Sequence, residues 1–222
     1  MNRTVANAIA LAGIVWGFGF GLSVALHLPA RVGVHFGVDG TPDRYGSALE
    51  AGLLLLMLPT VALLLNLLFV YLPRFDARAA AQHRVFDLIR VTTVLLLAVV
   101  QFAVAQAMQA QRFDLRLVMI ALGVFLTVIG NVMPKIPPNR FAGVRLPYTY
   151  ASRAAWWAAN RAGGWLLVIL GALLVLSAAV LPQATVVYAL LAVPIVSTAG
   201  LVRLTLLAKR EWQRDPERRP LG

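Results

Sequence analysis

The sequence predicts an all-α, polytopic membrane bundle of six transmembrane helices. Composition is the first reason: 60% of the 222 residues are hydrophobic and 13% are charged, whereas soluble chains average about 45–50% apolar and about 25% charged residues. The second reason is that the apolar residues gather in six long runs, and the third is that Lys and Arg fall in alternate loops. These features exclude disordered tails, collagen-like repeats and ordinary cytosolic enzymes.

The six apolar runs are each close to the roughly 20 residues with which a helix crosses a bilayer. The first run is longer than the apolar region of a signal peptide, about 7–15 residues, and no cleavage site follows it. We therefore expect six spans, at residues 5–28, 49–72, 88–108, 115–133, 165–181 and 184–207.

The basic residues set the expected orientation. With the N-terminus inside, 16 of the 20 Lys and Arg residues fall on the cytoplasmic side, including Arg74, Arg78 and Arg90 of the second loop. Such an excess marks the cytoplasmic face, so both termini are expected inside. The net charge of +11 is then mostly an orientation signal. It does not indicate direct nucleic-acid binding, because the basic residues flank spans and line no groove.

The spans themselves carry few chemical groups. All nine Asp and Glu residues, including Asp76 and Asp87, fall in loops or at span ends, which argues against a proton-driven pump. Gly13, Gly17 and Gly21 form a small-residue stripe in the first span. We expect the stripe to pack inside its own bundle, with a homodimer face as the alternative. Pro59 and Pro194 are expected to kink the second and sixth spans.

The first outside loop, residues 28–47, alternates apolar and polar residues from Arg31 to Asp39. This period of two predicts a short extended segment, closed by a turn at Asp39-Gly40. Pro42 predicts a second turn just before the next helix.

The same loop contains side chains that could ligate a metal, but no metal site is predicted. The chain has no cysteine, which excludes thiolate ligands, disulfides and a cysteine nucleophile. The remaining donors match no standard ligand spacing. They are His27, His35, Asp39, Asp43 and Glu50.

The second long loop, residues 131–164, is expected inside. Its three prolines forbid a regular helix through the first part, whereas Ser152 is a plausible N-cap for a short helix that follows. Trp156 and Trp157 suit the headgroup region. Two interpretations stay open: the helix rests its basic side on anionic lipid, or Lys135, Arg140 and Arg145 form a receptor for an anionic group or acidic partner.

These loops resemble two known sequence patterns. The inside loop resembles the signature of the SdpI family through Gly130-Asn131-x-Met133-Pro134-Lys135-x-x-Pro138-Asn139-x-x-x-Gly143-x-Arg145-x-Pro147, then Ser152, Trp156, Asn160-Arg161 and Gly164. The outside loop resembles the DUF1648 module through Pro29, His35-Phe36, Gly40, Asp43 and Tyr45-Gly46-Ser47. The resemblance implies two modules: residues 1–72 with the extracellular loop 29–48, and residues 73–222 with the cytoplasmic signature loop 131–164.

The resemblance also implies a function in the bacterial plasma membrane. The prototype of the SdpI family confers resistance to a secreted peptide toxin and holds a transcriptional repressor at the membrane when toxin is present. A toxin would then meet the outside loop, and a repressor the inside loop. The expected ligand residues outside are His35, Asp39, Asp43 and Tyr45, and the expected partner residues inside are Asn131, Lys135, Asn139, Arg140, Arg145, Trp156 and Arg161.

No catalytic residue, cofactor or metal is predicted, and membrane lipids are the remaining expected partners. One alternative function is a membrane enzyme or transporter for a lipid or amphiphile. A polar cavity that joins Asn66, Gln101 and Asn131 would favour this alternative, whereas a dry bundle with exposed loops would favour the receptor. Another alternative is a bundle that organises partner proteins.

Overall fold

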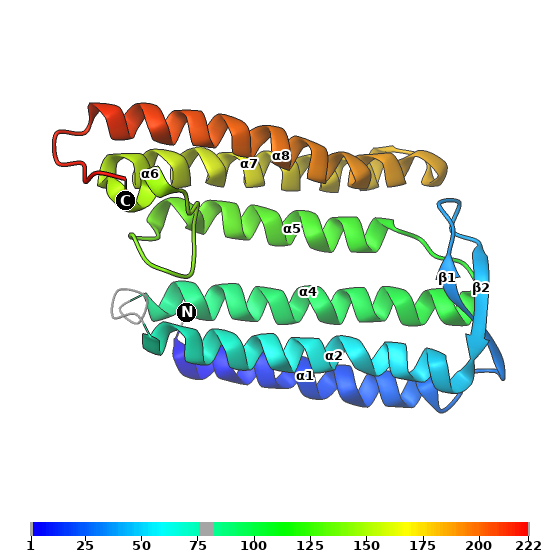
Figure 1. Cartoon of the computed structure of the whole chain (residues 1–222). Helices are drawn as coiled ribbons and strands as arrows, with labels where there is room; N and C mark the ends of the chain where they lie inside the picture. Colours follow the sequence, from blue (N-terminus) through cyan, green and yellow to red (C-terminus); the bar gives the residue numbers. More distant parts are fainter. Residues whose placement is uncertain (1, 76–81, 222) are drawn as a thin grey trace.

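The computed structural model describes residues 2–75 and 82–221, so that Asp76 and Arg78 lie outside the described residues. Six long helices lie side by side, with a β-hairpin at one end of the bundle and both termini at the other (Figure 1). The elements are α1 (Arg3–Ala25), β1 (Arg31–Phe36), β2 (Pro42–Ser47), α2 (Ala48–Tyr71), η1 (Leu72–Phe75), α4 (His83–Ala110), α5 (Arg116–Val132), η2 (Met133–Lys135), α6 (Pro147–Ala151), α7 (Arg153–Val180) and α8 (Gln183–Arg214).

Six of these helices are long and apolar enough to cross a membrane, which confirms the predicted fold class. The main correction concerns α7. Ser152 caps this helix as predicted, because its Oγ accepts the Ala155 backbone N–H at 3.0 Å. The segment that follows was expected as a separate interfacial helix, but α7 runs without a break to Val180. Trp156 is fully buried, so its indole is not half exposed to water as was expected.

The first outside loop forms an antiparallel hairpin in which Arg31 pairs with Ser47 and Phe36 with Pro42. The extended segment and the turn that closes it are confirmed. The second turn at Pro42 is wrong, because Pro42 begins β2, where a residue without an N–H is tolerated at the start of a two-stranded sheet. Ser47 ends the hairpin and caps α2, since its Oγ accepts the Glu50 N–H.

The glycine stripe of α1 packs inside the bundle, as predicted. A Cβ at Gly17 would lie 3.0 Å from Gln101 and Pro59, and one at Gly21 would lie 2.6 Å from Gln101. The fully buried Gln101 of α4 donates its amide to the Gly17 carbonyl at 2.7 Å and to the Leu55 carbonyl at 3.2 Å. Leu55 precedes Pro59 by four residues, so its carbonyl has no intrahelical donor. Gln101 therefore compensates for the proline and joins α1, α2 and α4.

Helices α5 and α7 approach each other through a second set of glycines. A Cβ at Gly123 would lie 2.6 Å from the Gly171 carbonyl, and a Cβ at either Gly130 or Gly164 would lie 2.5 Å from the carbonyl of the other. The glycines are seven residues apart on each helix, so the same close contact occurs twice, two helical turns apart. Backbone-to-backbone contact of this kind makes α5 and α7 a tightly packed pair.

Candidate functional site

The hairpin presents a polar surface at its end of the bundle. His35 lies 2.5 Å from Asp43, measured from Nδ1 to Oδ1, and both side chains are more than half exposed. Asp39 accepts the backbone N–H and the hydroxyl of Thr41, at 3.0 and 2.8 Å. These two bonds from Thr41 hold the pKa of the Asp39 carboxyl below its usual value. The hairpin thus carries a carboxylate that stays ionised at neutral pH.

Tyr45, the remaining ligand residue predicted outside, lies on β2 under the guanidinium of Arg31, 4.7 Å from its ring centroid. The five donors considered for a metal are spread over separate contacts, since His27 bonds to the Ser23 carbonyl and Glu50 accepts from Arg44. Within residues 2–75 and 82–221, no three His, Asp or Glu side chains converge.

The hairpin tip is docked on the connection between α4 and α5. The Phe113 N–H donates to the Gly40 carbonyl at 2.8 Å, and the rings of Phe36 and Phe113 lie 5.8 Å apart. Gly40 has a φ of +80°, and a Cβ there would collide with the Phe113 carbonyl. Glycine is therefore required on two grounds. On β1, the Gly33 N–H donates to the Gln111 side chain at 3.2 Å.

At the other end of the bundle, buried polar side chains fold the signature loop, residues 131–164. Asn139 accepts the N–H groups of Phe141 and Ala142, both at 2.8 Å, and donates to the Pro137 and Ala142 carbonyls. The Trp156 indole donates to the Ile136 carbonyl at 2.7 Å. Asn139 and Trp156, both predicted to bind a partner, are thus interior residues that shape the loop.

Asn160, also fully buried, joins α7 to the loop. Its Oδ1 accepts the Val144 N–H at 2.9 Å, and its Nδ2 donates to the Trp156 carbonyl at 2.9 Å. Gly143, at φ +110°, makes room for this amide, because a Cβ there would lie 2.5 Å from Asn160 Oδ1. The signature residues therefore encode one conformation of this loop.

Replacing Asn160 by Leu is expected to cost about 1–3 kcal/mol, because the Val144 N–H is left buried without an acceptor. The loop should also loosen, so trypsin should cut after Arg140 and Arg145 faster than in the unaltered protein. Thermal unfolding in detergent and timed proteolysis measure the two effects. Asn131→Leu, an exposed site on α5, is the matched control and should shift stability by less than about 0.5 kcal/mol. Equal losses in both variants would contradict this role of Asn160.

The other predicted partner residues are exposed and form two groups. Arg140 and Arg145 lie on the loop, where the Arg145 guanidinium donates to the Arg140 carbonyl at 2.9 Å. Asn131, Lys135 and Arg161 line a groove of about 420 Å³ between α5 and α7. The structure therefore brings together the three residues of the second group and keeps Arg140 and Arg145 apart from them.

The C-terminal tail folds back on the loop, a contact that was not predicted. Asp215 accepts the Ser152 hydroxyl at 2.5 Å, and the Arg219 N–H donates to the Ala151 carbonyl at 2.8 Å. The Trp212 indole donates to the Arg219 carbonyl at 3.0 Å. We call these contacts of residues 212–219 the tail latch. A polar pocket of about 310 Å³ lies between the tail and α6.

The tail latch is expected to depend on pH at the acidic end only. The Ser152 hydroxyl and the Glu217 N–H lower the pKa of Asp215 below its usual 3.8. A depressed folded-state pKa adds stability that is fully present above 3.8 and is lost as the pH falls through the lower value. The melting temperature of the protein should therefore exceed that of Asp215→Asn by a constant margin from pH 8 to about pH 5. The margin should shrink below about pH 4. A margin unchanged down to about pH 2 would show that the carboxylate does not hold the latch.

A buried ion pair joins α4 to its neighbours at the same end of the bundle as the loop. Asp87 and Arg90 lie in the first turns of α4, and both are packed inside the bundle, 3.0 Å apart. Arg90 also donates to Asn7 of α1 at 2.8 Å and to Asn66 of α2 at 3.3 Å. Asp87 and Arg90 are three residues apart on one helix, and this spacing is the feature of the sequence that could have predicted the ion pair.

The three amides that would mark a shared polar cavity lie in separate surroundings. Asn66 bonds to Arg90, Gln101 is sealed between helices α1, α2 and α4, and Asn131 faces the groove between α5 and α7. In the described part of the chain, these side chains therefore do not line one common path.

Comparison with known families decides the relationship. Residues 135–204 match the SdpI/YfhL protein family, and residues 12–63 match a domain of unknown function, DUF1648. The matches confirm the predicted resemblance to both patterns, and the chain is similar to the SdpI/YfhL family over less than half of its length. The family match covers the signature loop and helices α6 and α7 with much of α8, and the DUF1648 match covers most of α1, the hairpin and much of α2. No match was found among curated proteins or among solved structures.

Proposed function

We propose that this protein, which is similar to the SdpI/YfhL family over residues 135–204, is an immunity and signalling protein of the bacterial plasma membrane. The hairpin faces outside and binds a cationic secreted peptide toxin. The signature loop and both termini face the cytoplasm, where the loop engages a transcriptional repressor. The mechanism is binding without catalysis. The six membrane-spanning helices and the family match support a membrane protein of the immunity type.

The chemistry of the hairpin supports a cationic peptide as the ligand. Asp39 and Asp43 are exposed acids at its tip, and Asp39 is ionised at neutral pH. A backbone-paired hairpin also holds these side chains in fixed positions, so little conformational entropy is lost on binding. His35 and Tyr45 add a ring and a hydroxyl to the same surface.

The contact between Gly40 and Phe113 is the main observation in support of signalling from the hairpin to the loop. A ligand on the hairpin acts directly on the connection that leads into α5. Helix α5 packs on α7 through the glycine contacts and continues into η2 and the signature loop. A ligand that binds one packing of α5 more tightly than another would therefore shift the conformation of the loop. Coupling between two sites requires such a difference in affinity.

The inside surface is suited to an acidic or anionic partner. Arg140 and Arg145 project from a loop whose backbone is fixed by Asn139, Asn160 and Thr149. The tail latch borders the same loop and adds a second segment that a partner can contact. An enzyme or transporter for a lipid is the less favoured alternative, because Asn66, Gln101 and Asn131 lie in separate surroundings.

Binding of a labelled cationic peptide toxin to intact cells tests the outside site. Cells that express the protein should retain the peptide, and Asp39→Ala/Asp43→Ala should lower the affinity about tenfold or more, since two charged contacts are lost. Glu211→Ala/Glu217→Ala removes two acids at the opposite end of the bundle and should change nothing. Equal binding by the hairpin variant and the unaltered protein would overturn the outside site.

A further inference from the structure

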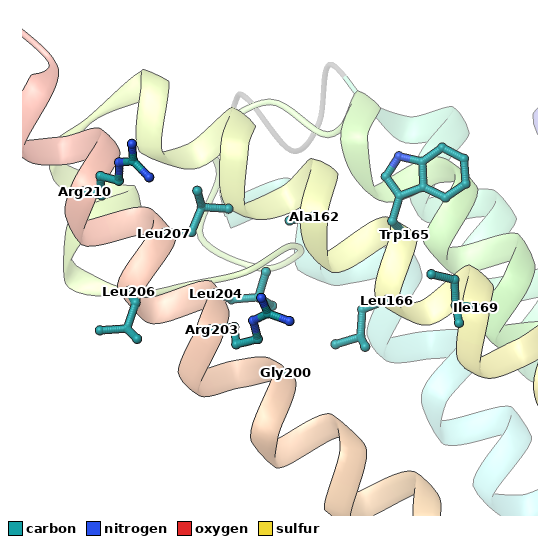
Figure 2. A pocket seen from close by; sticks show the side chains of 10 residues that line it. All are labelled: Ala162, Trp165, Leu166, Ile169, Gly200, Arg203, Leu204, Leu206, Leu207 and Arg210. Carbon is teal, nitrogen blue, oxygen red and sulfur yellow. The ribbon is translucent and has the colours of Figure 1, made fainter.

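A groove of about 680 Å³ runs between α7 and α8 on the surface of the bundle. Its walls are apolar over most of their length and include Leu166 and Ile169 on α7 and Leu206 on α8. Ile169 and Leu206 are more than half exposed, so the groove opens to the surroundings of the bundle. Figure 2 shows these side chains on both sides of the gap.

Two arginines lie along the α8 side of this groove. Arg203 and Arg210 project from α8 toward α7 (Figure 2). Seven residues are two helical turns, so the two guanidinium groups share one face of α8, with their Cα atoms about 10 Å apart along it. Trp165, which also lines the groove, is 63% exposed on α7, and an exposed indole on a spanning helix is typical of the headgroup level.

Neither arginine is neutralised by the protein. In residues 2–75 and 82–221, Arg203 and Arg210 have no carboxylate within ion-pair distance, and the nearest acid in sequence, Glu211, instead faces Arg214 at 3.9 Å. The groove lining contains no Asp or Glu. Arg203 lies eleven residues before the end of α8, about 17 Å along the helix axis. Arg203 thus lies within the sixth candidate span, and a cation within a spanning segment needs an anionic partner.

We propose that this groove is a binding site for an anionic phospholipid of the adjacent leaflet. The guanidinium groups of Arg203 and Arg210 bind the phosphate, for which the planar arginine fork is well shaped. One acyl chain lies against Leu166 and Ile169. The site differs from the hairpin and the signature loop that the proposed function uses, and it makes a bound lipid part of the α7–α8 interface.

The test is native mass spectrometry of the full chain, purified in mild detergent with equal amounts of phosphatidylglycerol and phosphatidylcholine. The unaltered protein should retain phosphatidylglycerol preferentially. Arg203→Gln/Arg210→Gln should lower that retention about tenfold or more, because each basic residue contributes about 1 kcal/mol toward anionic lipid. Ile169→Trp, at a lining residue that is more than half exposed, fills the apolar part of the groove without changing the charge and should also lower retention.

Two further variants keep the result interpretable. Arg203→Lys/Arg210→Lys keeps both charges and should retain most of the phosphatidylglycerol. Lys209→Gln/Arg214→Gln removes two charges from the same helix outside the groove lining and should leave retention unchanged. The proposal is overturned if this control loses as much lipid as the groove variant. It is also overturned if both lipids bind equally to the unaltered, folded protein, or if the groove holds a second copy of the chain and no lipid.

Discussion

Replacing Arg90 by Leu is expected to destabilise the protein by about 3–5 kcal/mol, the usual cost of leaving one member of a buried ion pair without its partner. Asp87 would then remain inside the bundle without its cation, while Asn7 and Asn66 would lose their donor. In the described part of the chain, Asp87 Oδ2 and Arg90 Nε have no hydrogen-bond partner. The contact between Asp87 Oδ1 and Arg90 Nη2 therefore balances the two buried charges. Unfolding in detergent, followed by far-UV circular dichroism, measures the loss.

The double variant Asp87→Leu/Arg90→Leu distinguishes destabilisation by an unpaired buried charge from destabilisation by altered packing. Apolar replacement of a complete buried pair is often neutral or stabilising, so the double variant should be more stable than Arg90→Leu alone. Arg84→Leu, an exposed arginine two turns earlier on α4, should shift stability by less than about 0.5 kcal/mol. A double variant less stable than the single one would show that packing, and not charge, dominates at this site.

Replacing Gly130 by Ala is expected to cost about 3 kcal/mol, the upper part of the range for overpacking a tight core. The new Cβ would lie 2.5 Å from the Gly164 carbonyl and 2.9 Å from the Val168 nitrogen. Both are backbone atoms, so α5 and α7 must separate to accept it. Because α5 leads into the signature loop, trypsin should also cut the loop faster. Thermal unfolding and timed proteolysis give the two measurements.

Gly19 provides the matched control on another membrane-spanning helix. A Cβ at Gly19 would have no heavy atom within 4 Å. Gly19→Ala should therefore be neutral or should stabilise the protein by up to about 1 kcal/mol, the difference in helix propensity. Similar losses from Gly19→Ala and Gly130→Ala would contradict the close approach of α5 and α7.

The sequence alone could predict the six long helices. Long apolar runs fix the spans because backbone polar groups in lipid must bond within a helix. The period-two pattern of residues 31–39 likewise predicted the first strand of the hairpin. The second strand was missed because Pro42, Asp43 and Gly46 all have low strand propensity. Its pairing follows from the turn at Gly40, whose carbonyl also accepts the Phe113 N–H.

The signature loop shows where prediction from sequence fails. Trp156 looks like an interfacial aromatic when only its neighbours in the sequence are considered. Its burial follows from the loop folding back over α7, so that Ile136, twenty residues earlier, accepts its indole N–H. Asn139 and Asn160 are buried for the same reason, because their amides bond to loop backbone. Long-range contacts of this kind leave no periodic trace in the sequence.

The polar residues that join helices were harder still to predict. Gln101 gains its partners because Pro59, on another helix, leaves the Leu55 carbonyl free. Asp215 and Ser152 are 63 residues apart, and they meet only because α8 returns to the level of the loop. The exposed acids of the hairpin and the exposed arginines of the loop are the parts of the site that the sequence could supply, since their chemistry does not depend on distant partners.

The central claim, protection against a secreted peptide toxin through the hairpin, is tested most directly by survival. A toxin-sensitive bacterium would express the protein or carry an empty vector, and both would be challenged with a panel of secreted antimicrobial peptides. We predict that the inhibitory concentration of at least one peptide rises with the unaltered protein and with Glu211→Ala/Glu217→Ala. It should return to the vector level with Asp39→Ala/Asp43→Ala. Identical inhibition with and without the protein for every peptide, with the protein present in the membrane, would contradict the claim.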